Sequence, residues 1–427
     1  MVLMESASFQ EGELLFSLPR SILLSLHTSD LAKCESLRPE LEALEGWNPL
    51  ILCMMYESQR EKSKWKSYFD ILPKKFSTPM FWNDDELRHL DGTGVIGKIG
   101  KEEAEKAYTD ILLPIINAHP EVFSLTVHTV DLFHICGSLI MAYSFEGEPA
   151  ASTSTSADQS DSDSDSDSDA APPTVITMVP LADMLNHRTG HNNARLFYEP
   201  TQLEMRCIKN IARGEQVYNT YGDRPNADLL RMYGFVDEMN EYDVVEISGN
   251  VVVEVCCKDE EEKEQKVSLK RIEFLLEEDI LDDYFVLDTA GNIPPELIVT
   301  AKILSMPPAE FASMQETQRL PKPKMTPEIC TMLLEVLEYR LSLYRTSLED
   351  DDALLAASDF VTINCRNAIT VQLGEKRILH TALDRLRVWQ PEPEPMTTKE
   401  KRSANKGGKD AKQGGERDEG RKKPRVK

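Results

Sequence analysis

Two stretches of this 427-residue sequence decide its fold. Residues 179–187 read Val-Pro-Leu-Ala-Asp-Met-Leu-Asn-His, and residues 219–236 read Asn-Thr-Tyr-Gly-Asp-Arg-Pro-Asn-Ala-Asp-Leu-Leu-Arg-Met-Tyr-Gly-Phe-Val. The second stretch holds two Tyr-Gly pairs, at Tyr221 and Tyr233. Two core tyrosines that close strand ends would give the same pattern, so the spacing alone leaves a structural and a functional interpretation open. The Asn186-His187 turn beside them favours the functional one.

The histidines of this region also raise the question of a metal site. Asp183, His187 and His191 are spaced i, i+4, i+8, which on a helix would place a carboxylate and two imidazoles on one face. The intervening residues include Asn186, Gly190, Asn192 and Asn193, which favour a loop. We therefore predict no metal ligands here.

Strand signals flank a long helical region. Residues 12–26 are strand-like with an interruption at Pro19, and the turn at Gly12-Glu13 is echoed by Gly214-Glu215 within residues 211–221. Apolar residues at helical spacing predict helices over 41–145. Further strands are predicted at 175–179, 203–208 and 244–255.

After residue 258 the pattern becomes helical again. Apolar side chains recur at helical spacing over 329–344 and 379–389, and Thr326-Pro327 is typical of a helix start. The sequence thus predicts an α+β first domain over 1–246, with a helical insert at about 41–145, and an all-helical second domain over 258–390.

Two segments lack the apolar residues needed to offset ordering entropy. Residues 150–173 consist largely of Ser-Asp repeats, and residues 391–427 form a Lys- and Gly-rich tail. Both are predicted to be disordered. The cluster at 422–427, Lys-Lys-Pro-Arg-Val-Lys, is typical of a nuclear import signal, although such clusters also occur by chance in solvated tails.

The net charge of −25 is unevenly distributed. Residues 399–427 hold 12 Lys and Arg against 5 Asp and Glu, which leaves 36 basic and 68 acidic residues in 1–398. A body this acidic disfavours nucleic acid binding and permits a basic protein substrate. No apolar run is long enough for a membrane span, and eight cysteines without a C-x-x-C pair indicate free thiols in a reducing compartment.

Two familiar enzyme motifs are absent. Gly92-Thr-Gly-Val-Ile-Gly97 resembles a dinucleotide-binding loop only loosely, because no strand precedes it. No Gly-x-Ser-x-Gly nucleophile elbow occurs either.

The two opening stretches resemble the SET-domain lysine methyltransferases. The similarity rests on Ala182 to His187, Tyr221-Gly222 and Tyr233 to Val236, with support from residues 46–50, 79–82, 92–95, 141–145 and 377–380. Within that superfamily the chain resembles the branch of the RuBisCO large-subunit methyltransferase. In this branch a helical insert splits the SET domain, and a helical substrate-binding domain follows.

The resemblance implies S-adenosylmethionine as the cofactor and a lysine of a basic ribosomal or nuclear protein as the acceptor of one methyl group. It assigns the catalytic phenol to Tyr221. It assigns cofactor contacts to Asn186, His187, Tyr233, Tyr143 and Trp47, and the border of the lysine channel to Asp183, Ser144 and Phe235. The protein is expected to be a monomer of the nucleus, with the cytoplasm as the alternative.

One feature departs from that family. Its Gly-x-Gly turn upstream of the Gly-Glu turn would fall at or before Met1, and no such glycines are present. We therefore expect part of the cofactor pocket to be missing, which keeps a catalytically weak lysine-peptide binding module as the alternative function. Methylation of a histidine is a third interpretation, because a relative in the superfamily performs it.

Overall fold

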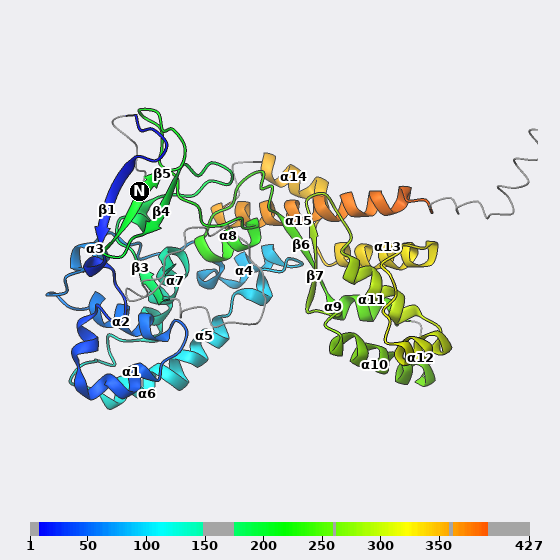
Figure 1. The fold of residues 1–427 in the computed structure, drawn as a ribbon, viewed down its shortest axis with the longest axis horizontal. Coiled ribbons are helices and arrows are strands. Elements are labelled where there is room, and N and C mark those ends of the chain that lie inside the picture. Colours follow the sequence, from blue (N-terminus) through cyan, green and yellow to red (C-terminus); the bar gives the residue numbers. More distant parts are fainter. Residues whose placement is uncertain (1–7, 148–174, 259–261, 358–361, 392–427) are drawn as a thin grey trace, which may run out of the picture.

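The computed structural model describes residues 8–147, 175–258, 262–357 and 362–391. These residues form two lobes, one of short sheets and helices and one that is mostly helical (Figure 1). Helix α15 (Ile363–Val388) runs along both of them and contacts elements of each. The predicted α+β architecture is confirmed, whereas the second domain, predicted to be all-helical, is mostly helical because the strand β7 (Tyr284–Asp288) lies in it. The segments predicted to be disordered, 150–173 and the tail beyond residue 391, lie outside the described residues.

The first lobe contains two small antiparallel sheets. One has the strand order β1-β5-β4, formed by β1 (Leu14–Pro19), β5 (Gln202–Cys207) and β4 (Ala194–Tyr198). The other pairs β2 (Ser144–Gly147) with β3 (Val175–Met178). Leu18, Leu203 and Met205 pack against Val179 and Leu185 of the loop that follows β3. The predicted strands at 175–179 and 203–208 are confirmed, whereas the one at 12–26 ends at Pro19.

The two Gly-Glu turns have the same hydrogen bonds. The backbone N–H of Gln10 donates to Glu13 Oε2, and that of Ala212 donates to Glu215 Oε2, both at 2.8 Å. The glycines of both turns have positive φ, +85° at Gly12 and +82° at Gly214, which glycine adopts without a Cβ penalty. A bridge between Phe9 and Ile211 holds the turns beside each other.

Helices fill the chain between β1 and β2. They are α1 (Arg38–Glu42), α2 (Asn48–Ser58), α3 (Lys66–Ile71), α4 (Asp84–Leu87), α5 (Lys101–Ala107), α6 (Leu113–Ala118) and α7 (Val130–Tyr143). Leu52 and Met54 of α2 belong to the same buried core as Leu139 and Ile140 of α7. Because β2 begins directly after α7, this packing fixes where Tyr143 and Ser144 lie. The predicted helical insert is confirmed.

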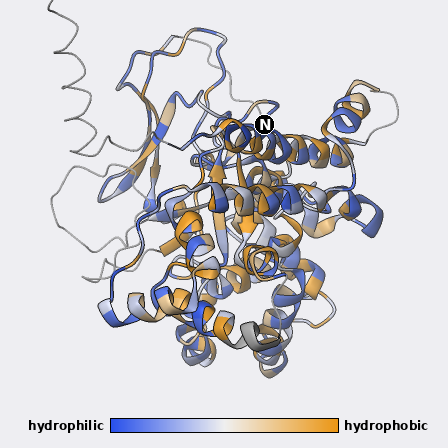
Figure 2. Cartoon of the chain, turned by 90° about the vertical axis from the view of Figure 1, so that its right-hand side faces the viewer, coloured by the Kyte–Doolittle hydropathy of each residue, from blue (hydrophilic) through white to orange (hydrophobic). Residues whose placement is uncertain are grey.

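The second lobe packs helices around one two-stranded sheet. The sheet pairs β6 (Val244–Ser248) with β7 (Tyr284–Asp288). The helices are α9 (Gly249–Cys256), α10 (Glu262–Glu277), α11 (Pro295–Ser305), α12 (Pro308–Thr317), α13 (Pro327–Ser342) and α14 (Leu348–Ala356). Apolar side chains gather in the interior of this lobe. Figure 2 colours the chain by hydropathy and shows hydrophobic residues along the strands and parts of the helices. The predicted start of α13 is confirmed, because the Thr326 hydroxyl accepts from the N–H of Ile329.

The predicted strand over 244–255 is wrong in its second half. The Ser248 hydroxyl accepts from the N–H of Asn250 and starts α9, so the run of valines that follows is helical. The predicted end of the first domain at residue 246 also falls inside β6. Val245 and Ile247 of β6 pack in the core of the second lobe.

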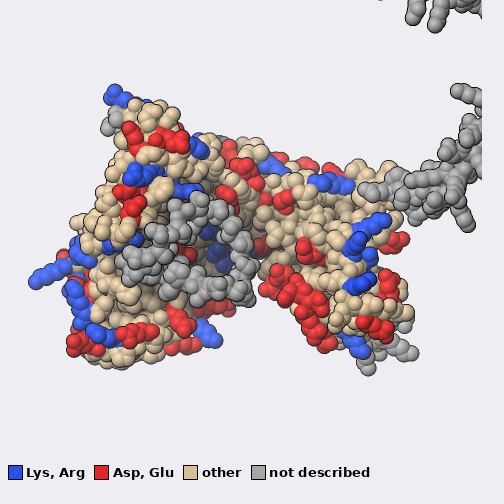
Figure 3. Space-filling model, viewed as in Figure 1, with Lys and Arg blue, Asp and Glu red and all other residues tan. Residues whose placement is uncertain are grey.

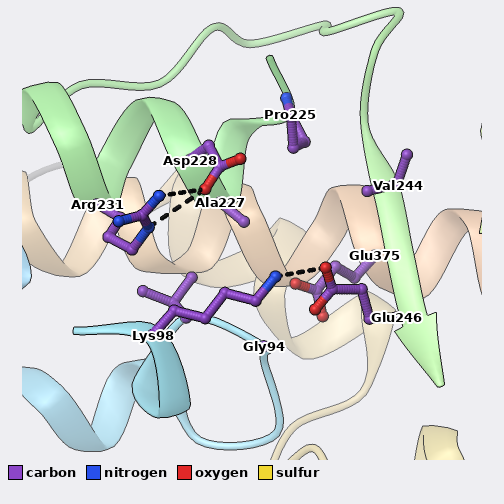
Figure 4. A pocket seen from close by; sticks show the side chains of 10 residues that line it. Gly94, Lys98, Pro225, Ala227, Asp228, Arg231, Val244, Glu246 and Glu375 are labelled. Carbon is purple, nitrogen blue, oxygen red and sulfur yellow. Dashed lines mark hydrogen bonds and ion pairs between the residues drawn. The ribbon is translucent and has the colours of Figure 1, made fainter. Parts of the chain in front are cut away.

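Buried charges and glycines join the two lobes. Arg340 of α13 donates to the carbonyls of Gly92 (2.7 Å) and Glu246 (2.8 Å) and forms an ion pair with Glu375 of α15. Figure 4 shows Lys98 reaching Glu246 across a cavity of about 30 Å³. A Cβ at Gly92 would lie 2.7 Å from the carbonyl oxygen of Leu343. Gly92 and Gly94, where a Cβ would lie 2.9 Å from Glu246 Oε2, therefore allow close packing between the lobes.

Two further expectations concern the whole chain. Cys53, Cys136 and Cys330 are buried free thiols, as predicted. Among the described residues, no helix combines the length and the apolar character that crossing a bilayer requires.

Candidate active site

Two adjoining cavities open where the loops after β3 and β5 meet α7 and α8 (Asn226–Tyr233). The larger, about 410 Å³, is lined by Asn186, His187, Tyr218, Phe235 and Asp237 among others. The smaller, about 280 Å³, is lined by Trp47, Ser144, Asp183, Thr220 and Arg224 among others. Tyr143, Tyr221 and Tyr233 line both. Every site residue that the sequence predicts therefore lines at least one of the two cavities.

Hydrogen bonds tie the two opening stretches together at this junction. The N–H of Asn219 donates to the carbonyl of Asn186 at 3.0 Å. The N–H of Tyr221 donates to His187 Nδ1 at 3.1 Å, and the Tyr221 hydroxyl donates to the carbonyl of Leu185 at 2.9 Å. Tyr221 is thus held at both its backbone and its phenol oxygen.

His187 acts here as a neutral imidazole. Because Nδ1 accepts the Tyr221 N–H, the ring proton lies on Nε2. Burial lowers the pKa of His187, although the nearby Asp237 opposes this. The imidazole stacks on the Tyr221 ring with centroids 5.1 Å apart, and Tyr221 stacks on Tyr233 at 4.5 Å. The three rings form a continuous aromatic wall.

The Tyr221 phenol stays protonated. Burial, with Tyr143, Tyr233 and Asp183 close by, raises the pKa of Tyr221 well above its ordinary value. A phenol in this state is a hydrogen-bond donor and a dipole, and it is a poor general base at neutral pH.

A glycine turn presents Tyr233 and Phe235. Gly234 ends α8 in the left-handed conformation, with φ +78°. A Cβ at Gly234 would lie 3.0 Å from the carbonyl carbon of Ser77 and 3.2 Å from the nitrogen of Thr78, so both the conformation and the space require glycine. The buried Asn226 side chain then bonds the backbone N–H and carbonyl of Asp237, which fixes the segment after the turn.

Asp183 is buried in the wall of the smaller cavity. Its Oδ2 accepts from the hydroxyl of Tyr68 on α3, and its Oδ1 has no hydrogen-bond partner. Residues 185–193 form a loop and an isolated bridge, so the spacing of Asp183, His187 and His191 does not place them on one helix face. No cluster of three potential metal ligands occurs among the described residues.

Trp47 and Phe235 each line only one of the two cavities. Trp47, at the start of α2, lines the smaller cavity with Ser144 and Asp183. Phe235 lines the larger cavity with Asn186 and His187. Both are aromatic residues beside a glycine, and their sequence context carries no information about which cavity they face.

Sequence reasoning missed several residues of the site. They are Tyr218 and Asp237 in the larger cavity, Arg224 in the smaller one, and Tyr68 behind Asp183. The Gly12-Glu13 turn is repeated in sequence at Gly214-Glu215, and the repeat aligns Tyr218 with Phe16. This alignment was a usable signal for Tyr218. Nothing in the sequence pattern marks Tyr68.

Comparisons with known proteins agree with this geometry. A SET domain family model matches residues 3–222, and a Rubisco LSMT substrate-binding model matches residues 261–379. The chain belongs to the SET-domain N-lysine methyltransferases, as the sequence predicted. Enzymes of this family take the methyl group from S-adenosylmethionine.

Individual relatives sharpen this class. Human N-lysine methyltransferase SETD6 is 33% identical over 405 residues, which cover 88% of this chain and 82% of the human protein. The Xenopus tropicalis setd6 is 34% identical over 404 residues, which cover 88% of this chain and 86% of the frog protein. The SET domain of LSMT bound to methyllysine and AdoHcy has the same fold, with a TM-score of 0.63 at 17% identity over 90% of this chain and 84% of that one.

Proposed function

We propose that this protein transfers one methyl group from S-adenosylmethionine to the ε-amino group of a lysine in a basic ribosomal or nuclear protein. The observation that carries the proposal is that two adjoining cavities share the side chain of Tyr221, whose hydroxyl is held by the Leu185 carbonyl. Methyl transfer needs a donor and an acceptor that approach each other in line, one from each side.

The larger cavity fits the cofactor. It joins the polar groups of Asn186 and His187 to the ring faces of Tyr233 and Phe235, and such walls suit an adenosine and a sulfonium cation. Its volume of about 410 Å³ is in the range of small-ligand pockets. We therefore place Phe235 on the cofactor side, contrary to the role that the family resemblance implied.

The smaller cavity fits a lysine side chain. The indole of Trp47 can cover the apolar stem while Ser144 and Asp183 face its polar end. We therefore place Trp47 on the acceptor side, again contrary to the role that the resemblance implied.

The bound cofactor supplies an electrophilic methyl group on a positively charged sulfur. The residues of the chain make the acceptor reactive. Roughly one free lysine in a thousand is neutral at pH 7, so the amine must be desolvated to favour its neutral form. The Tyr221 hydroxyl, fixed by the Leu185 carbonyl, then orients the amine by its dipole.

A basic substrate is consistent with the charge of the body. Figure 3 shows Asp and Glu side chains over both lobes, with a dense group on the side of the second lobe that faces the first. Residues 1–398 carry 68 acidic against 36 basic residues, and such a field raises the local concentration of cationic partners. This supports ribosomal and nuclear proteins, which are rich in lysine, as the substrate class.

Radiolabelled S-adenosylmethionine tests the proposal with purified ribosomal proteins and, separately, nuclear proteins as acceptors. We expect label on a single protein, and mass spectrometry should find one methyl group on a lysine. Label on a histidine, or none with either mixture, would contradict the proposal. Peptide binding in calorimetry without cofactor binding would instead support a binding module.

We also propose that the protein works in the nucleus. The cluster Lys422-Lys423-Pro424-Arg425-Val426-Lys427 supports this, since such clusters serve as import signals. A fluorescent fusion should lose nuclear enrichment when Lys422, Lys423 and Arg425 are changed to alanine. Unchanged distribution would assign the tail another role.

A further inference from the structure

Asp183 presents an unpaired oxygen beside the proposed lysine site. The residue is 4% exposed and lines the same cavity as Ser144 and Tyr221. One oxygen, Oδ2, accepts from Tyr68, whereas Oδ1 is buried without a hydrogen-bond partner. A buried oxygen of this kind is costly to keep, and native proteins rarely do so without a function.

The backbone that carries Asp183 is strained. Leu181, two residues earlier, has φ +82° and ψ −45°, a conformation that is rare for a residue with a side chain. The N–H of Asp183 then donates to the carbonyl of Val179 and closes a tight turn. Strain that persists beside a cavity is typical of a functional site.

Within the described part of the chain, no cation compensates the Asp183 carboxylate. The titratable groups that face it are phenols from three different segments, Tyr68 of α3, Tyr143 of α7 and Tyr221. Arg224 also lines the cavity, but its Nε donates to the carbonyl of Tyr221, and Glu146 lies exposed at the rim. Among the described residues, no ion pair of Asp183 with Lys, Arg or His is found.

Burial makes Asp183 a better proton acceptor than an ordinary carboxylate. Burial raises the pKa of Asp183 to about 7, although the bond from Tyr68 and the amides of Leu181 and Asp183 lower it. The pKa of Asp183 then lies roughly three units below the ordinary pKa of lysine, about 10.4, whereas that of an ordinary carboxylate lies roughly six units below it. Because burial disfavours both an ammonium and a carboxylate, the neutral amine and the neutral acid become accessible together.

We propose that Asp183 accepts the proton that the substrate lysine must lose before methyl transfer, and that Tyr68 is the positioning residue that holds the carboxylate. This inference rests on the proposed methyltransferase function. An N–H bond of the ammonium breaks and leaves its electron pair on nitrogen, while an O–H bond forms at Oδ1. The amine attacks the methyl group and becomes a methylammonium, and Asp183 later returns its proton to solvent.

Single-turnover rates between pH 6 and pH 10 test this, with the full chain, saturating radiolabelled S-adenosylmethionine and the ribosomal protein mixture. In the unmodified protein the rate should rise tenfold per pH unit up to about pH 7 and then level off. In Asp183→Asn it should rise throughout, by about 100-fold between pH 8 and pH 10, because only the neutral fraction of lysine reacts. Because the unmodified rate is level over this range, the ratio of the unmodified rate to the variant rate should fall by about 100-fold between pH 7.5 and pH 10.

Tyr68→Phe gives an independent readout that a purely structural role would not affect. Loss of the hydrogen bond should move the break in the profile to higher pH and leave the rate at pH 9 within about twofold. Asp70→Asn, an exposed change on the same helix, should reproduce the unmodified profile.

Two results would overturn the inference, namely a deficit of Asp183→Asn that is the same at every pH, or a break that Tyr68→Phe does not move. If Asp183→Asn does not fold, the Tyr68→Phe profile decides alone. Absence of methyl transfer by the unmodified protein at any pH would instead overturn the proposed function, and this inference with it.

Discussion

The hydroxyl of Tyr221 donates a 2.9 Å hydrogen bond to the backbone carbonyl of Leu185, 36 positions earlier in the chain. This bond joins the two motif stretches at the point where the two cavities meet. The bond also fixes the orientation of the phenol, because its partner is a backbone carbonyl in the loop that follows β3. The position of the Tyr221 phenol is therefore fixed by the backbone of both loops.

His187 should support cofactor binding as a neutral acceptor. In His187→Ala the Tyr221 N–H loses its partner and the ring stack loses a member, so we expect the dissociation constant for S-adenosylmethionine to rise by about 10-fold or more. Titration calorimetry measures this. His191→Ala, an exposed histidine of the same loop, is the control and should bind normally. Equal losses in both variants would refute the role of His187.

The lowered pKa of His187 also predicts a pH dependence. Since the pKa in the folded state lies below the unfolded value of about 6.5, the stabilising contribution is complete above that value and is lost as the pH falls below it. The difference in unfolding free energy between the unmodified protein and His187→Gln should be constant from pH 7 to pH 8. It should shrink as the pH falls from about 6.5 toward pH 5. A difference that grows toward acid pH would contradict the assigned neutral state.

Gly234 should tolerate no side chain. Gly234→Ala adds a Cβ 3.0 Å from Ser77 in addition to the left-handed strain, so urea unfolding should show a loss of more than about 2 kcal/mol. The control is Gly214→Ala, which has φ +82° and open space around its Cβ, and should lose only about 1 kcal/mol. Equal losses would mean that the contact with Ser77 is unimportant.

The buried ion pair of Lys376 and Asp351 should show strong coupling. Both side chains are 1% exposed, and the Lys376 amine also donates to Thr346 and Gln372. Lys376→Met should cost about 3–5 kcal/mol because it leaves a buried carboxylate unpaired, and adding Asp351→Leu should recover part of that loss. Arg387→Ala, which removes an exposed pair on the same helix, should cost less than about 1 kcal/mol. Additive losses in the double variant would contradict the pairing.

Local signals predicted the parts of the site that local rules fix. The Gly12-Glu13 and Gly214-Glu215 pairs marked turns, and both turns are present with positive φ at the glycine. Thr326-Pro327 marked the start of α13 by its capping hydroxyl. These features depend on a few neighbouring residues, so their sequence carries the information.

Features set by distant packing escaped prediction. The Tyr68–Asp183 bond spans 115 positions, and no periodicity announces it. The valines after Ser248 have strand propensity, yet α9 packs them as a helix against the core of the second lobe. Which cavity Trp47 and Phe235 face is decided by the packing of α2 and by the Gly234 turn, and it needs the structure.

If a substrate lysine is methylated beside the phenol of Tyr221, that phenol should be needed for methyl transfer. Single-turnover rates of the unmodified protein and of Tyr221→Phe measure this. Both proteins should bind S-adenosylmethionine with similar affinity, since the ring and its stacking remain. The rate of label transfer to lysine should fall by about 10²–10³-fold in Tyr221→Phe, because the oriented phenol hydroxyl is lost. Equal transfer rates in the two proteins would contradict it.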